Sequence, residues 1–186
     1  MRDTCPTDVI SVLKAQHAEI RWAFIRAAMP GPEQPASFRR LVRLLAVHEA
    51  AEETHVHPTV RHISSAAQAA AARLEEERRA KRLLVMLNRT GPDGEGYLRT
   101  LRALRRAVLI HAAREERSEF PALATLSRPR RWVLGQEVRL ARYLAPTRPH
   151  PHVNGMLANR IAVPVFGPVD RCRDLADRWL PRNRRH

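Results

Sequence analysis

Apolar side chains recur at intervals of three and four residues along four long stretches of this chain. This spacing places them on one face of an α-helix, so each stretch is predicted to form an amphipathic helix. The predicted helices span residues 7–28, 35–58, 65–89 and 97–120. Thr7 is placed to cap the first helix, and Pro35 suits the first turn of the second. Ser65 and Gln68 have the spacing of a capping box for the third.

The linkers between these helices are short, so consecutive helices should lie antiparallel. The sequence therefore predicts an all-α fold, an up-down-up-down four-helix bundle, with additional C-terminal helices. A fifth helix is predicted over residues 130–144, followed by a Pro/His linker. A last amphipathic helix carries on one face Val169, Cys172, Leu175 and Trp179. We expect the bundle to occupy residues 1–127 and a basic helical extension, residues 128–186, to pack on it.

Polar side chains interrupt three of the apolar stripes at positions that should face the core. In the first helix, for example, His17 lies between Leu13 and Ile20. A buried carboxylate must be neutralised, paired or bound to a metal, so these positions need a chemical explanation. The polar residues on the stripes are His17, His48, Glu52, His55, His111 and Glu115.

An internal repeat connects the second and fourth helices. The segment HEAAEETHVHP at residues 48–58 matches HAAREERSEFP at residues 111–121. Both copies begin with histidine, continue with two adjacent glutamates and end with proline. Residues four apart lie side by side on a helix, so each copy should present an imidazole next to a carboxylate.

The two pairs are His48 with Glu52 and His111 with Glu115, and both should point inward. Together with His17 they can surround a small cavity. Imidazole and carboxylate groups suit iron, manganese or zinc, and one carboxylate from each helix can bridge two ions. The alternative is that each pair is an ordinary ion pair on a solvated helix. Repetition of the motif on two apolar stripes favours the metal site.

These motifs resemble those of the hemerythrin-like family, also called the HHE cation-binding domain. The resemblance covers residues 8–124, with a histidine on the first helix and H-x-x-x-E-E followed by proline on the second and fourth. The segment RPHPHVNGMLANRIAVPVFGPVDRCRD also resembles the C-terminal extension of many actinobacterial members. The resemblance implies a four-helix bundle around a non-haem di-iron centre that handles dioxygen, nitric oxide or peroxide, or that senses iron and oxygen.

By this resemblance, His17, His48, Glu52, His111 and Glu115 fall on iron-ligand positions. The two glutamates would bridge the irons, and the three histidines would be terminal ligands. Manganese and zinc are the alternative ions. The resemblance leaves open whether the protein is an enzyme; if it is one, the expected reaction is reduction of peroxide or oxygen.

The third helix departs from the family pattern, which usually supplies a histidine before A-K-x-x-L. This chain reads EEERRAKRLL, with Glu77 and Arg78 at that place. Glu77 shares the apolar stripe of Leu84 and Leu87, whereas Arg78 and Lys81 lie off it. We therefore predict that Glu77 takes the ligand position, because a glutamate can bind iron. The alternative is a site that holds one metal or none.

The remaining polar residues near the motifs are assigned simpler places. His55 is expected at the mouth of the site, and Glu49 is expected to be exposed. Four further histidines lie near prolines or in a linker and are expected at the surface: His57, His62, His150 and His152.

Charge raises a different possibility. Of the formal net charge of +14, residues 128–186 contribute +9, from 13 arginines and four acidic residues (13 − 4). A basic tail attracts nucleic acid through a field that does not depend on sequence. The alternative function is therefore a basic module that binds nucleic acid or an acidic partner, or a metal-free scaffold. Nucleic-acid binding is expected to be non-specific at most.

Other motifs exclude several classes. Cys5 and Cys172 form no C-x-x-C pair, which fits a reducing compartment. No signal peptide or membrane-spanning stretch is evident, so we expect a cytoplasmic protein without a membrane partner. The chain has no P-loop, G-x-S-x-G or Gly-rich dinucleotide motif, and phosphate-transfer and hydrolase functions have no support.

Overall fold

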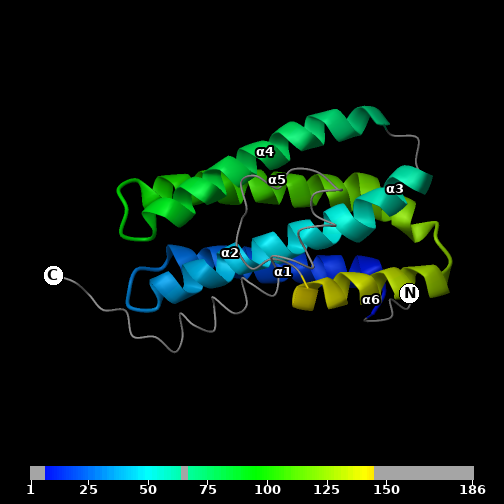
Figure 1. Cartoon of the computed structure of the whole chain (residues 1–186), viewed down its shortest axis with the longest axis horizontal. Helices are drawn as coiled ribbons and strands as arrows, with labels where there is room; N and C mark the ends of the chain where they lie inside the picture. Colours follow the sequence, from blue (N-terminus) through cyan, green and yellow to red (C-terminus); the bar gives the residue numbers. More distant parts are fainter. Residues whose placement is uncertain (1–6, 64–66, 145–186) are drawn as a thin grey trace.

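The computed structural model describes residues 7–63 and 67–144; within 67–78 and 142–144 it describes the backbone alone. These residues form helices and contain no strand, so the predicted all-α fold is confirmed. Four long helices run side by side as a bundle (Figure 1). They are α1 (Val9–Ala28), α2 (Gln34–Ala51), α4 (Ala67–Thr90) and α5 (Tyr97–Ala124). None of the described helices is long and apolar enough to cross a membrane.

Helix α1 begins one residue later than predicted. Asp8, rather than Thr7, is its N-cap, because the Asp8 carboxylate accepts a hydrogen bond of 3.0 Å from the backbone N–H of Ile10. This bond satisfies one of the amides that a helix start leaves without an intrahelical partner. The helix ends where Met29 adopts an extended conformation. Helix α2 then starts with Pro35 in its first turn, as expected for a residue without an N–H.

The second predicted helix is longer than expected and changes its winding. Helix α2 passes into a π-helical turn, η1 (Glu52–Val56), which passes into α3 (His57–Ile63). In the π turn the His57 N–H donates to the carbonyl of Glu52, five residues earlier. Pro58 therefore does not end the helix, contrary to the prediction, but occupies the first turn of α3.

Helices α4 and α5 are joined by a tight turn. Gly91 and Gly96 have positive φ angles of 70° and 74°, a backbone conformation in which glycine avoids a steric penalty. Helix α5 continues through Pro121 to Ala124, beyond its predicted end. The predicted capping residue Ser65 lies outside the described residues.

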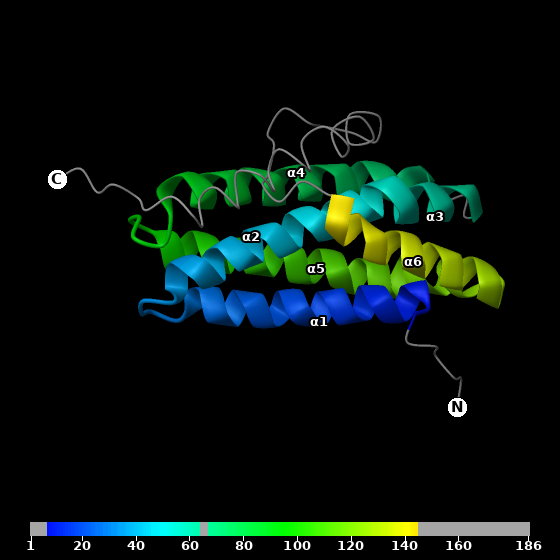
Figure 2. The same ribbon diagram turned by 60° about the horizontal axis from the view of Figure 1, so that its bottom comes forward.

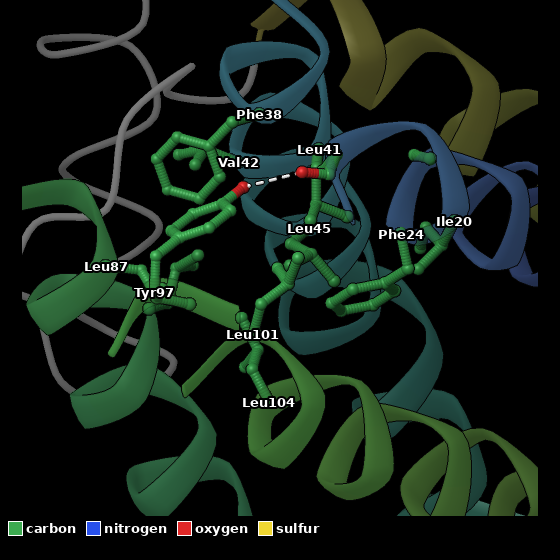
Figure 3. Close-up of a cluster of buried hydrophobic side chains, with 13 residues drawn as sticks. Ile20, Phe24, Phe38, Leu41, Val42, Leu45, Leu87, Tyr97, Leu101 and Leu104 are labelled. Atoms are coloured by element: carbon green, nitrogen blue, oxygen red, sulfur yellow. Dashed lines mark hydrogen bonds between the residues drawn. The ribbon is translucent and has the colours of Figure 1, made fainter. Parts of the chain in front are cut away.

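One apolar cluster fills the end of the bundle near the α4–α5 turn (Figure 3). Its side chains come from α1, α2, α4 and α5 and include Phe24, Leu41, Leu87 and Leu104. The Tyr97 hydroxyl donates a buried hydrogen bond of 2.9 Å to the carbonyl of Ala27, which ties the start of α5 to the end of α1.

A second apolar cluster fills the opposite end and includes α6 (Arg128–Leu144). Helix α6 lies alongside α1 (Figure 2). Gly135 of α6 approaches the backbone of Thr7 and Val9 so closely that a Cβ would overlap the Thr7 carbonyl oxygen. Arg131 donates a hydrogen bond of 2.6 Å to the cap residue Asp8 and others to the carbonyls of Ala124 and Leu126. This one guanidinium connects α1, α5 and α6. Residues 145–186, where the last helix was predicted, lie outside the described residues.

The two clusters do not meet along the helices. On α1, His17 separates Leu13 of the second cluster from Ile20 of the first. On α2, His48 lies between Leu45 of the first cluster and Ala51 of the second. A layer of polar side chains therefore crosses the middle of the bundle.

Candidate metal centre

Four elements supply the polar layer, and they bring together five of the predicted site residues. His17 comes from α1, His48 from α2, Glu52 from the start of η1, and His111 and Glu115 from α5. The relative exposure is 2% for His17, 7% for His48, 1% for Glu52 and 2% for Glu115, and the side chain of His111 is 14% exposed. Imidazoles and carboxylates are thus gathered in an almost closed interior.

Each carboxylate lies between two imidazoles. Glu52 is 3.2 Å from His48 Nε2 through one oxygen and 3.8 Å from His111 Nε2 through the other. Glu115 is likewise 3.4 Å from His111 Nε2 through one oxygen and 3.4 Å from His17 Nε2 through the other. The Nε2 atoms of all three rings therefore face the carboxylates.

The outer nitrogens of two rings have partners of their own. His17 Nδ1 is 2.9 Å from a carboxylate oxygen of Glu116, which also accepts from Arg21 at 3.4 Å. His48 Nδ1 is 2.8 Å from the side-chain oxygen of Gln16. Such contacts fix the orientation of an imidazole and make Nδ1 the protonated nitrogen, leaving Nε2 as a lone-pair donor. Sequence reasoning missed both partners, although Glu116 is the second glutamate of the repeated H-x-x-x-E-E motif.

The inner atoms of the layer are buried without hydrogen-bond partners among the described residues. They are His17 Nε2, His111 Nε2, both carboxylate oxygens of Glu52 and both of Glu115. Leaving such atoms unpaired away from water is unfavourable by about 1–3 kcal/mol each, and more for charged groups. One ligand atom from each of His17, His48, Glu52 and Glu115 lies within 4.8 Å of the others. These donors fit a bound divalent cation, which would satisfy the atoms that the protein leaves unpaired.

Burial and mutual charge shift the pKa values within the layer. Burial lowers the pKa of His48 to about 4, so its ring is neutral near neutral pH. Burial, reinforced by the negative charge of Glu115, raises the pKa of Glu52 to about 7. For Glu115, burial acts to raise the pKa, but the adjacent rings of His111 and His17 outweigh it and hold the pKa well below its usual range.

His17 and His111 shift in the opposite direction to His48. Burial acts to lower the pKa of each ring, but the neighbouring carboxylates outweigh it. Glu115 and Glu52 together raise the pKa of His111 to about 11, and the same two residues with Glu116 raise that of His17. Without a metal, protons therefore hold the carboxylates and rings together, which is the role that a cation can take over.

Comparison with known proteins agrees with this geometry. The family model for the hemerythrin HHE cation binding domain matches residues 8–123, more than half of the 186-residue chain. The chain belongs to this family. The resemblance inferred from the repeated motif is thereby confirmed.

One solved structure resembles the hemerythrin domain described here, that of a hemerythrin HHE cation binding domain-containing protein from Mycobacterium kansasii. The TM-score is 0.63 at 24% sequence identity, and the match covers 73% of this chain and 85% of the other. At this identity the likeness concerns the fold. A search of curated proteins found no match.

The third-helix ligand predicted for the hemerythrin site, Glu77, lies on α4 where the side chains are outside the described residues, and so does Arg78. Further along α4, Leu84 and Leu87 are 6% and 0% exposed, so this part of the predicted apolar face is buried as expected. Lys81, expected to point away from the site, lies 2.8 Å from Glu53 and 3.2 Å from Glu49. Glu49, expected to be exposed, is half-buried by this contact. Although burial lowers it, the charges of these two carboxylates raise the pKa of Lys81.

The histidines after Glu52 also lie differently from the prediction. His57, expected at the surface, has a side chain only 12% exposed, and its Nδ1 lies 3.4 Å from the buried carboxylate of Glu119. His55, expected at the mouth of the hemerythrin site, instead points to Glu137 of α6, with Nδ1 3.6 Å from its carboxylate. The reason is the π turn, which adds one residue to the helical turn and brings His57 onto the inward face together with the buried Val56.

Proposed function

We propose that this hemerythrin domain holds a non-haem di-iron centre that binds or reduces a small ligand: dioxygen, nitric oxide or peroxide. Glu52 and Glu115 would bridge the two irons, and His17, His48 and His111 would be terminal ligands. The observation that carries the proposal is that each buried carboxylate faces two imidazoles, while its own two oxygens lack hydrogen bonds within the described residues. Membership of the HHE cation binding family supports the binding of a cation. The nitrogen and oxygen donors suit iron, with manganese or zinc as alternatives.

The chain's own residues would control what the iron does. When bound, the iron would supply redox chemistry and open coordination positions for the ligand. Gln16 and Glu116 hold the rings of His48 and His17, so that the donor atoms need little rearrangement. The carboxylates would offset the charge of the ions in a setting from which bulk water is excluded.

The enclosure of the site favours a very small ligand. His17, Glu52 and Glu115 are each at most 2% exposed, and the most exposed of the five residues is His111. Because so little of the site is exposed, it suits a diatomic molecule or peroxide better than a larger substrate, which would require the helices to separate. The ligand is therefore expected to enter the site on the side where His111 lies.

Glu77 would complete the ligand set on the third helix. Alanine at this position is expected to lower the iron content or weaken the near-ultraviolet absorption, while Arg78→Ala should leave both nearly unchanged. Glu77→His, which supplies the usual family residue, should keep the metal. If Glu77→Ala retains the full iron content and an unshifted spectrum, Glu77 is not a ligand.

The proposal is tested by metal analysis. Protein purified without chelator and reconstituted anaerobically with ferrous iron is expected to carry about two irons per chain and to absorb in the near ultraviolet after oxidation. His111→Ala and Glu115→Gln should lose iron, whereas His62→Ala, at an exposed position of α3, should retain it. A colourless protein with well below one iron per chain would contradict the proposal.

A further inference from the structure

A second cluster of metal-binding side chains adjoins the first. One ligand atom from each of His57, Glu115 and Glu119 lies within 4.8 Å of the others. Glu115 thus belongs both to this cluster and to the group of His17, His48 and Glu52. We infer that His57, Glu119 and Glu115 form an additional cation position, one helical turn further along α5, joined to the first through the shared Glu115 carboxylate.

Two features of the fold create this cluster. On α5, Glu115 and Glu119 are four residues apart and lie on one face of the helix. On the other side, the π turn carries His57 round to the inward face, where its Nδ1 lies 3.4 Å from Glu119 Oε2. A π turn often marks a functional position in an otherwise α-helical segment. Here it changes which histidine faces the interior.

The surroundings favour a cation over a simple ion pair. Glu119 is 2% exposed and is followed on α5 by Phe120 and Leu123 of the second apolar cluster. Glu115 is also 2% exposed, and neither of its carboxylate oxygens has a hydrogen-bond partner among the described residues. An ion at this position would meet a nitrogen and carboxylate oxygens, the donor types preferred by ferrous iron, manganese and zinc.

The inference deepens the proposed function and rests on it, because the additional ion shares Glu115 with the proposed centre. It leaves Glu77 in the third-helix ligand place proposed above and adds His57 and Glu119 from other elements. Ligands from η1–α3 and from the end of α5 would hold an ion, where the family pattern depends on the third helix.

The test compares metal content in matched variants. His57→Gln and Glu119→Gln remove one donor each with little change in volume, and His55→Gln is the control, because this neighbouring imidazole faces Glu137 on α6. Each purified full-length protein would be loaded anaerobically with ferrous iron, and separately with zinc, freed of excess metal and analysed. Thermal unfolding followed by circular dichroism would show that each variant is folded.

We expect His57→Gln and Glu119→Gln each to hold one ion fewer per chain than the wild type, and His55→Gln to match the wild type. Wild-type content in both folded variants would overturn the inference and leave the proposed centre intact. A wild type that binds a single ion, retained in His48→Ala but lost in Glu119→Gln, would support the inference and remove the proposed di-iron centre. A wild-type protein that binds no metal would overturn both.

Discussion

Glu52 shows how strongly one residue depends on its surroundings in this protein. The same H-x-x-x-E spacing on a solvated helix would give a carboxylate with an ordinary pKa and a weak ion pair. Here burial and the charge of Glu115 raise the pKa of Glu52 to about 7, and its two oxygens have no hydrogen bond within the described residues. Burying this carboxylate is unfavourable in free energy, and a bound cation can offset that cost.

Metal binding is therefore expected to release protons. In the metal-free protein His111 has a pKa of about 11 and Glu52 one of about 7, while His48, with a pKa of about 4, is already neutral. At pH 8, loading should release at least one proton per chain, from His111, and His17 adds to this count to the extent that its raised pKa keeps it charged. At pH 6 it should release about two or more, since Glu52 is then protonated as well.

Protons compete with the metal for these atoms, so the apparent affinity should rise with pH. The expected slope is at least one log unit per pH unit near pH 8 and is steeper near pH 6, where Glu52 is also protonated. Calorimetric titration with zinc in buffers of different ionisation enthalpy measures the proton count directly. Absent proton release would show that His111 does not bind the ion, and equal release at the two pH values would show that Glu52 does not.

His57 marks what the sequence could not show at this scale. The positions of His17, His48, Glu52, His111 and Glu115 on apolar stripes follow from α-helical periodicity, and the structure gathers them in one layer. The same periodicity assigned the inward position to His55, because it assumes 3.6 residues per turn throughout. The internal repeat did contain a signal: residue 57 corresponds to residue 120, which is a buried phenylalanine.

At the scale of elements, helix existence was easier to predict than helix ends. The stretches from 7 to 28 and from 97 onward were found because many apolar residues contribute to each pattern. Pro58 and Pro121 were read as stops, since proline lacks an N–H and disfavours an interior helical position. In the structure both helices continue, Pro58 in the first turn after a π turn and Pro121 within α5. The end of a helix depends on the local preference of one or a few residues, and tertiary packing can override that preference.

The contact between α6 and α1 depends on the absence of one side chain. Because a Cβ at position 135 would overlap the Thr7 carbonyl oxygen, Gly135→Ala must push α6 away from the start of α1. We expect a loss of about 1–3 kcal/mol in the free energy of unfolding, the range for overpacked sites, despite the better helix propensity of alanine. Chemical denaturation measures the change.

Arg139→Ala is the matched control, because it makes an alanine at an exposed position of the same helix. It should leave the free energy of unfolding within about 0.5 kcal/mol of the wild type. Gly135→Ala with unchanged or increased stability would mean that α6 is not held against α1 in solution.

On the scale of the whole molecule, the described helices account for the proposed metal site better than they account for the excess of positive charge. Residues 145–186, which carry much of the basic charge, lie outside the described residues, so the nucleic-acid hypothesis stays a hypothesis. The four long helices of the hemerythrin fold and the presence of a further helix after residue 128 were predictable from periodicity. The course of α6 across the start of α1 was not, because it depends on the contact at Gly135 and on the reach of Arg131.

The polar layer between the two apolar clusters has a consequence for cooperativity. Each cluster is stabilised by its own buried surface, while the buried polar atoms between them weaken the join in the absence of a cation. Native-state hydrogen exchange should therefore show amides near residues 48–57 opening separately from both ends in metal-free protein. Bound ions would stabilise the layer in proportion to their affinity. Loading with metal would then convert two independently fluctuating ends into one cooperative unit, visible as a single, sharper calorimetric transition.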